Sequence, residues 1–221
     1  MCIRDSCHSV PEGHFDGDEP LALPVCPGEA GESFDFANVT RRGINMDATW
    51  TAIIGRQFGA AIDMLENALR RCPDELWSAR LWHDPAQRSE FSEFWYIAYH
   101  TLFWLDLYLS GSVDGFARPA PFTLDEMDPA GLLPERRYSQ DELQAYLDHN
   151  RDKCRTTLAM LTDDQARQRC TFSWGEVSYA ELLLDNMRHV QEHSAQLNLF
   201  LGQQINSAAR WIAQAKSTRD T

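Results

Sequence analysis

Basic residues are scarce in this chain of 221 residues, in which 20 Lys and Arg stand against 33 Asp and Glu and give a formal net charge of -13 at pH 7. Nucleic-acid-binding proteins usually gather Lys and Arg on one face, so we expect no nucleic-acid partner. Long apolar runs are also lacking. The densest run, from Phe94 to Leu109, is interrupted by His100 and Asp106 and falls short of the roughly 20 residues that a membrane helix needs. We therefore expect a soluble protein without a membrane partner.

Cysteines with the spacing of a metal site are lacking as well. Three of the six cysteines crowd the first 26 residues, and Cys72, Cys154 and Cys170 are scattered over the remainder. The N-terminus has no apolar segment typical of a secretory signal, so we expect reduced thiols and a cytoplasmic location. Gly-rich phosphate loops and sustained period-two alternation are not visible either. A nucleotide-binding enzyme is therefore disfavoured, and an all-α fold is favoured.

The first 45 residues differ from the rest of the sequence. They are rich in Pro, Gly, Asp and Glu and have no helical or strand periodicity. The opening from Met1 to Ser6 (MCIRDS) matches the conceptual translation of a sequencing-library transposon end, and residues 7–45 resemble upstream DNA translated in frame. We predict that residues 1–45 are non-native and that Met46 is the true start. A genuine disordered extension is the alternative.

Helical periodicity begins near Trp50. Apolar residues three and four apart predict a first helix that ends before Cys72 and Pro73. A second helix, apolar on nearly every side, is predicted from about Glu90 to Leu109 and should be the most buried. Residues 111–138 contain four prolines, and we interpret them as a long crossover between helices two and three.

Two further helices are predicted from capping boxes, in which a Ser and a Glu three residues later satisfy free backbone N–H groups. The third helix reaches about Leu161, and the fourth ends at Gly202, a typical helix-ending residue. The boxes are Ser139 with Glu142 and Ser178 with Glu181. We thus predict a four-helix bundle over residues 46–202, followed by a short C-terminal helix and tail over 203–221.

Three histidines stand out chemically. His189 and His193 lie four residues apart on the fourth helix, a spacing that places both rings on one face where they can share a metal ion. His100 lies in the middle of the aromatic second helix, where an imidazole without a partner costs about 1–3 kcal/mol. The alternative is that no metal is bound: His100 forms a hydrogen bond inside the core, and the pair on the fourth helix is solvated.

These residues carry a family resemblance. The stretch from Tyr99 to Leu102 on the second helix, the two histidines of the fourth helix and the Gln196–Asn198 stretch resemble the DinB-like superfamily of metalloproteins, over about residues 50–202. The resemblance implies a divalent metal ion, Zn, Ni or Fe, held by His100, His189 and His193 with an open fourth position. It also implies a homodimer.

The resemblance further implies an enzyme acting on a small-molecule substrate. Known relatives include bacillithiol- and mycothiol-dependent transferases, so the metal is expected to activate water or a low-molecular-weight thiol, as in a hydrolase or an S-transferase. This sequence contains no signature that we can match to a thiol cofactor. The alternative is a stress-response or interaction module that binds metal without turnover.

Other side chains are candidates to serve the site. Asp185, one turn before His189, is the candidate catalytic base, with a solvated helix charge as the alternative. Glu93 and Tyr96 lie on the same side of the second helix as His100 and are candidates to touch the pocket. The neighbouring aromatic residues are predicted to belong to the core; these are Trp95, Tyr99 and Trp104.

Overall fold

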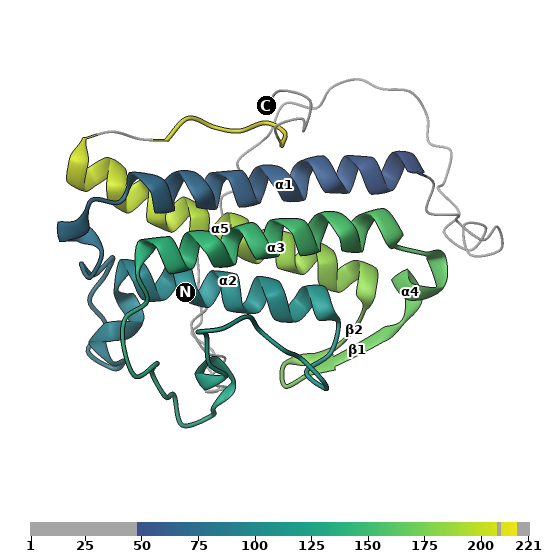
Figure 1. Ribbon diagram of the computed structural model, residues 1–221, viewed down its shortest axis with the longest axis horizontal. Coiled ribbons are helices and arrows are strands. Elements are labelled where there is room, and N and C mark those ends of the chain that lie inside the picture. Colours follow the sequence, from purple (N-terminus) through teal and green to yellow (C-terminus); the bar gives the residue numbers. More distant parts are fainter. Residues whose placement is uncertain (1–47, 207–208, 216–221) are drawn as a thin grey trace, which may run out of the picture. The chain divides into compact units, whose positions relative to one another are not determined.

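A computed structural model of the protein describes residues 48–206 and 209–215. The interpretation of residues 1–45 as non-native lies outside these described residues. Four long helices form a bundle (Figure 1), so the predicted all-α class is confirmed. They are α1 (Ala48–Arg71), α2 (Phe94–Ser110), α3 (Gln140–Met160) and α5 (Tyr179–Ile205). Within the described residues, no helix is both long and apolar enough to cross a membrane.

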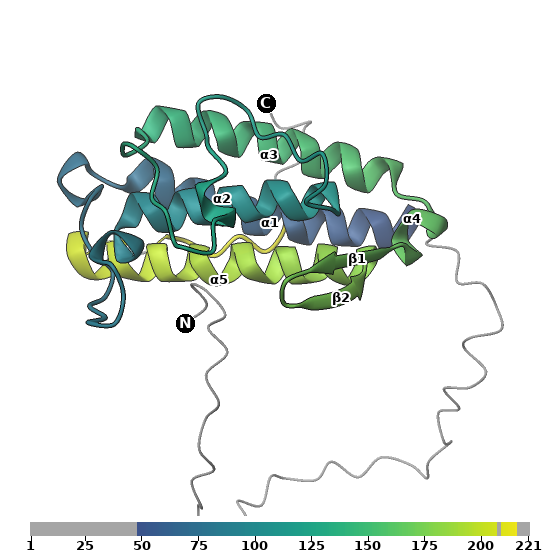
Figure 2. The ribbon, with the colours of Figure 1, turned by 90° about the horizontal axis from the view of Figure 1, so that it is seen from below.

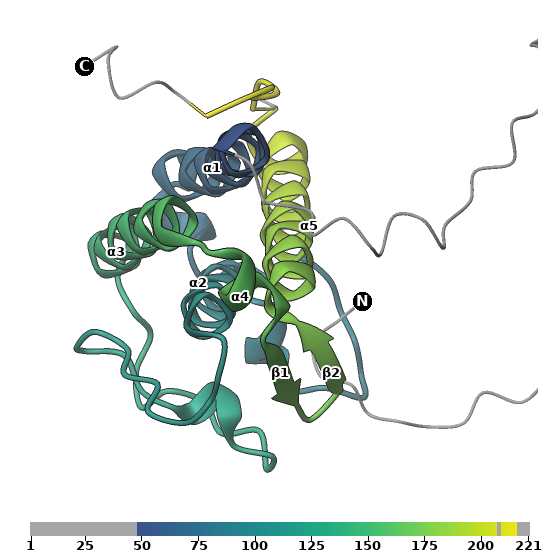
Figure 3. The same ribbon diagram turned by 90° about the vertical axis from the view of Figure 1, so that its right-hand side faces the viewer.

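The four helices form a square in cross-section, with α1 diagonally opposite α2 and α3 diagonally opposite α5 (Figure 3). Polar side chains at the helix contacts show how neighbouring helices align. Asn150 donates to the carbonyl of Leu102, and Lys153 donates to the carbonyl of Asp106, so α2 and α3 run in the same direction. The helix α2 is buried on nearly all sides, as its apolar sequence predicts.

The parallel arrangement of α2 and α3 explains the long crossover between them. Because α2 has 17 residues, about 25 Å of helix, the chain must return along that length before α3 can begin. Gly111 ends α2 in the left-handed conformation (φ 74°) that glycine favours. The crossover then lies across α2 (Figure 2), where Phe122 stacks on Tyr146 of α3 at 4.2 Å between ring centroids. It contains one 3₁₀ turn, η4 (Asp125–Met127), that matters for the site.

Two predicted helix ends differ from the structure. The second helix begins at Phe94 and not near Glu90, because residues 89–92 form a 3₁₀ turn, η3, and Glu93 is extended at the N-cap. The fourth helix does not end at Gly202 but continues to Ile205, and Asn206 ends it in the left-handed conformation (φ 50°). A glycine inside a helix costs only about 1 kcal/mol, which the packing of α5 against α1 and α2 offsets.

A small hairpin between α3 and α5 was not predicted. After the short helix α4 (Asp163–Arg167), the strands β1 (Arg169–Phe172) and β2 (Gly175–Ser178) pair antiparallel. Trp174, at the turn, donates from Nε1 to the hydroxyl of Tyr108 at 2.9 Å and so attaches the hairpin to α2. Each strand has four residues, too few for alternation to register in the sequence.

The expected short C-terminal helix is absent from the described residues 209–215, which are not helical. They run along α1 instead (Figure 1), where Ala215 N donates to the carbonyl of Arg56 at 2.9 Å. Gln57 donates from its side chain to the carbonyl of Ala213 at 3.0 Å. Gly59 permits this approach, because a Cβ at that position would lie 2.6 Å from the Ala215 Cβ. A helix of so few residues has little stability by itself, so the contacts with α1 decide the conformation of this segment.

Candidate metal centre

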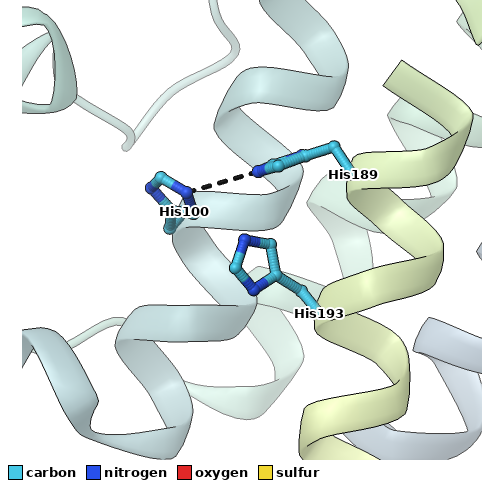
Figure 4. Close-up of side chains that lie close together, drawn as sticks. All are labelled: His100, His189 and His193. Atoms are coloured by element: carbon cyan, nitrogen blue, oxygen red, sulfur yellow. Dashed lines mark hydrogen bonds between the residues drawn. The ribbon is translucent and has the colours of Figure 1, made fainter. Parts of the chain in front are cut away.

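The three predicted histidines meet between α2 and α5 (Figure 4). These helices are adjacent in the bundle, so His100 from α2 faces His189 and His193, which lie one turn apart on α5. The ring centroid of His100 lies 5.2 Å from that of His189 and 5.1 Å from that of His193. One potential ligand nitrogen from each ring lies within 4.8 Å of the other two. The cluster therefore joins residues that are far apart in the sequence.

One nitrogen of each ring is placed where the three could share a metal ion. The Nε2 atoms of His100 and His189 are 3.3 Å apart, about the separation of two nitrogen ligands at 2.0–2.1 Å from one tetrahedral zinc ion. Two further nitrogens, Nδ1 of His189 and Nε2 of His193, are buried without a hydrogen-bond partner among the described residues. Because buried polar atoms rarely stay unpaired, the unpaired Nε2 of His193 and the facing Nε2 atoms of His100 and His189 are a donor set expected of a metal site.

Burial keeps the rings on α5 in the form that binds metals. Only 1% of His193 is exposed, and this burial lowers its pKa to about 3, with the nearby His100 adding to the shift. Burial also lowers the pKa of His189 well below its usual value, and the neighbouring His193 and His100 act in the same direction. Both imidazoles are therefore neutral at pH 7, and a neutral imidazole has a free lone pair for a metal ion.

A carboxylate that the sequence did not predict as a site residue touches the cluster. Glu126, in the η4 turn of the crossover, lies with Oε2 2.7 Å from Nδ1 of His100, and its side chain is 5% exposed. Trp104 donates from Nε1 to the same oxygen at 3.0 Å, and Tyr96 donates from its hydroxyl to Oε1. Burial alone would raise the pKa of Glu126, but His100 and the three hydrogen bonds lower it, so the carboxyl group is ionised.

The remaining sequence candidates divide between the site and other parts of the bundle. Tyr96 reaches the site through Glu126. The predicted core residue Trp104 also reaches the site, because its indole contacts the same carboxylate. Glu93 does not join the cluster but accepts from Arg137 and Trp95. The other two aromatic residues are buried in the core as expected; they are Trp95 and Tyr99.

Asp185 lies one turn before His189 on α5 and is half-buried. Its carboxylate accepts from Arg188 at 3.4 Å, an ion pair on the outer side of the helix. The carboxylate seen in contact with a cluster histidine is that of Glu126. The role of Asp185 as a catalytic base therefore stays a prediction.

Comparisons with known proteins place this bundle in a family. A sequence model of the DinB superfamily matches residues 57–197, a range that runs from α1 to α5 and includes all three histidines. The chain belongs to the DinB superfamily. The resemblance expected from the sequence around His100 and His193 is thereby confirmed.

Solved structures offer one further likeness for this DinB superfamily member. The chain is similar to the DinB-like protein YjoA of Bacillus subtilis, with 15% sequence identity and a TM-score of 0.49. The match covers 74% of this chain and 99% of that one. No curated protein sequence matches this chain.

Proposed function

We propose that His100, His189 and His193 bind a divalent metal ion, Zn, Ni or Fe, and that the protein is a metal-dependent enzyme acting on a small molecule. The convergence of three histidines with unpaired buried nitrogens supports this proposal more than any other observation. All three candidate ligands are imidazole nitrogens. Three such ligands leave a coordination position open, as in catalytic zinc sites and unlike closed structural ones.

The chemistry proposed is that of a hydrolase or a thiol S-transferase. A bound divalent ion would act as a Lewis acid and bring the pKa of a water or thiol ligand near neutrality. The chain's own residues orient the ligands. Oε2 of Glu126 lies 2.7 Å from Nδ1 of His100, and Gln196 accepts from Nδ1 of His193 at 2.8 Å, so these contacts use Nδ1 of both rings and leave Nε2 to face the cluster.

His189 is the more accessible member of the cluster. It is half-buried, whereas His100 and His193 are buried. A small molecule would therefore reach the cluster from the side of His189. Leu124 and Met127, which flank the site carboxylate in the crossover, are 41% and 37% exposed and provide apolar surface beside that turn.

Other features accompany this proposal. Cys72, Cys154 and Cys170 are buried free thiols in the described residues, which supports a reducing, cytoplasmic location. Burial raises the pKa of Cys72 and of Cys154 to about 12, so neither thiol is a nucleophile at neutral pH. The homodimer implied by the family resemblance stays a prediction.

A turnover screen tests the enzymatic part of the proposal. The full chain, loaded in turn with zinc, nickel and iron, is assayed with ester and amide substrates and with low-molecular-weight thiols paired with small electrophiles. We expect turnover with at least one pair, its loss in His193→Ala, and its retention in His83→Ala, which changes an exposed histidine outside the cluster. Uniform failure with the metal bound would instead favour a metal-binding module without turnover.

A further inference from the structure

The side chain of Glu126 connects the crossover to the candidate metal centre. Its carboxylate receives hydrogen bonds from three residues of α2, namely Tyr96, His100 and Trp104. These residues are spaced by four, so they lie on one face of the helix, one turn apart from each other. Side chains from three successive turns of α2 thus converge on one carboxylate, with His100 between the other two.

The crossover is anchored just before this carboxylate. Phe122, four residues before Glu126, is buried and stacks on Tyr146 of α3. The carbonyl of Thr123 accepts from the hydroxyl of Tyr99 at 3.1 Å. The crossover is therefore held against α2 and α3 immediately before the turn that carries Glu126. An anchor of this kind is what holds a ligand-supporting group in place before the ligand binds.

The hydrogen bonds also fix which nitrogen of His100 carries the proton. The indole N–H of Trp104 can only donate, and it points at the same oxygen, Oε2, that faces His100. Oε1 of Glu126 accepts from the Tyr96 hydroxyl and Oε2 accepts from the Trp104 indole, so the carboxylate is an acceptor at both oxygens, and we assign Nδ1 of His100 as its third donor. In the neutral ring Nε2 then has the lone pair, and Nε2 is the atom that faces His189 at 3.3 Å.

We propose that Glu126 is the positioning residue of the cluster: it holds His100 as the Nδ1–H tautomer and so presents Nε2 to the ion that the proposed function places among the three histidines. The inference rests on that proposed function only for the ion itself. The tautomer is a property of the metal-free protein. Carboxylates in this arrangement orient the ring and make its ligand nitrogen more basic, and their loss commonly weakens metal binding 10- to 100-fold.

The first arm of the test needs no variant and no metal. The ring nitrogens of ¹⁵N-histidine-labelled, metal-free protein are measured by NMR, and the His100 signals are assigned by their disappearance in His100→Gln. We expect His100 with a protonated Nδ1 and an unprotonated Nε2. A protonated Nε2 with a bare Nδ1 would overturn the proposal, whatever the protein binds.

The second arm measures zinc affinity by competition with a chromophoric chelator. We expect Glu126→Ala to bind zinc 10- to 100-fold more weakly than the parent and to lose the single Nδ1–H tautomer. Glu126→Gln retains an oxygen that can accept from His100, so it should keep the tautomer and bind more tightly than the alanine variant. Glu135→Ala, which removes an exposed carboxylate of the same crossover, serves as the control and should match the parent.

The outcomes separate this inference from the proposed function. If Glu126→Ala binds zinc as tightly as the parent, Glu126 has no positioning role. If the parent binds no zinc, nickel or iron, the proposed function fails, while the NMR spectrum still decides whether Glu126 sets the tautomer. Should the alanine variant not fold, the parent spectrum and Glu126→Gln still decide, because loss of the Nδ1–H tautomer in the glutamine variant would contradict the proposal.

Discussion

The buried ion pair between Asp106 on α2 and Lys153 on α3 provides a sharp test of how the bundle is held together. The Asp106 side chain is fully buried, and its Oδ1 lies 2.5 Å from Nζ of Lys153. The ammonium group also donates to the Asp106 carbonyl at 2.8 Å and to the Ser110 hydroxyl at 2.7 Å, while Tyr146 donates to Oδ2 at 2.9 Å. Lys153→Met keeps the apolar stem and removes the ammonium charge. The buried carboxylate then keeps the hydrogen bond from Tyr146, and Nε2 of His149 lies 3.6 Å from its Oδ1.

Breaking a buried pair by removing one partner usually costs about 3–5 kcal/mol, because the other charge stays buried. The Lys153 side chain is 25% exposed and water can reach its former position, so we expect the lower end, about 3 kcal/mol, in urea unfolding. The double variant Asp106→Asn with Lys153→Met should recover part of this loss, since no charge is then left buried. The control Arg155→Met breaks an exposed pair with Asp152 on the same helix and should cost no more than about 1 kcal/mol. Equal losses of unfolding free energy in Lys153→Met and Arg155→Met would refute the reasoning.

Three further predictions follow from other contacts. Hydrogen bonds from Arg136 and from the backbone at the helix start lower the pKa of Glu142 to about 2. The stabilisation from its charged form is therefore present above about pH 4.5 and is lost as the pH falls toward 2. In urea unfolding, Glu142→Gln should be less stable than the parent at pH 7, and the difference in unfolding free energy should vanish between pH 4.5 and 2. Asn186→Ala removes a buried hydrogen bond to the Leu105 carbonyl and should cost about 1–3 kcal/mol by chemical denaturation; an unchanged midpoint would contradict this. Zinc at about 100 times its dissociation constant should stabilise the parent by about 2.7 kcal/mol in thermal unfolding, and His100→Ala should show no such gain.

Local signals in the sequence predicted most of the bundle and singled out the candidate histidines, and the family resemblance joined the three histidines into one proposed site. His189 and His193 share a face because helix geometry fixes the positions of residues four apart. His100 was recognisable because an imidazole inside an apolar helix needs a partner. The third helix begins where its capping box predicts, with Ser139 accepting from the Glu142 N–H and Glu142 accepting from the Ser139 N–H. Each of these inferences depends on neighbours in the sequence.

The features that sequence analysis missed depend on distant contacts. Glu126 lies 26 residues from His100, in a stretch without periodicity that contains several other acidic residues, and its place is set by the path of the crossover over α2. Residues 209–215 have a helical pattern but form hydrogen bonds with α1 instead of a helix, and Gly59 permits this close approach. The end of α5 at Ile205 and not at Gly202 has the same kind of cause, because packing outweighed the local preference of glycine.

Metal stoichiometry tests the central claim most directly. The full chain, stripped with a chelator and reloaded separately with zinc, nickel and iron, is analysed for metal content beside His100→Ala, His193→Ala and the exposed control His83→Ala. We predict close to one ion per chain for at least one metal in the parent and in the control, and loss of that ion in both cluster variants. A parent that binds none of the three metals, or cluster variants that bind as much as the control, would contradict the assignment of these histidines as a metal centre.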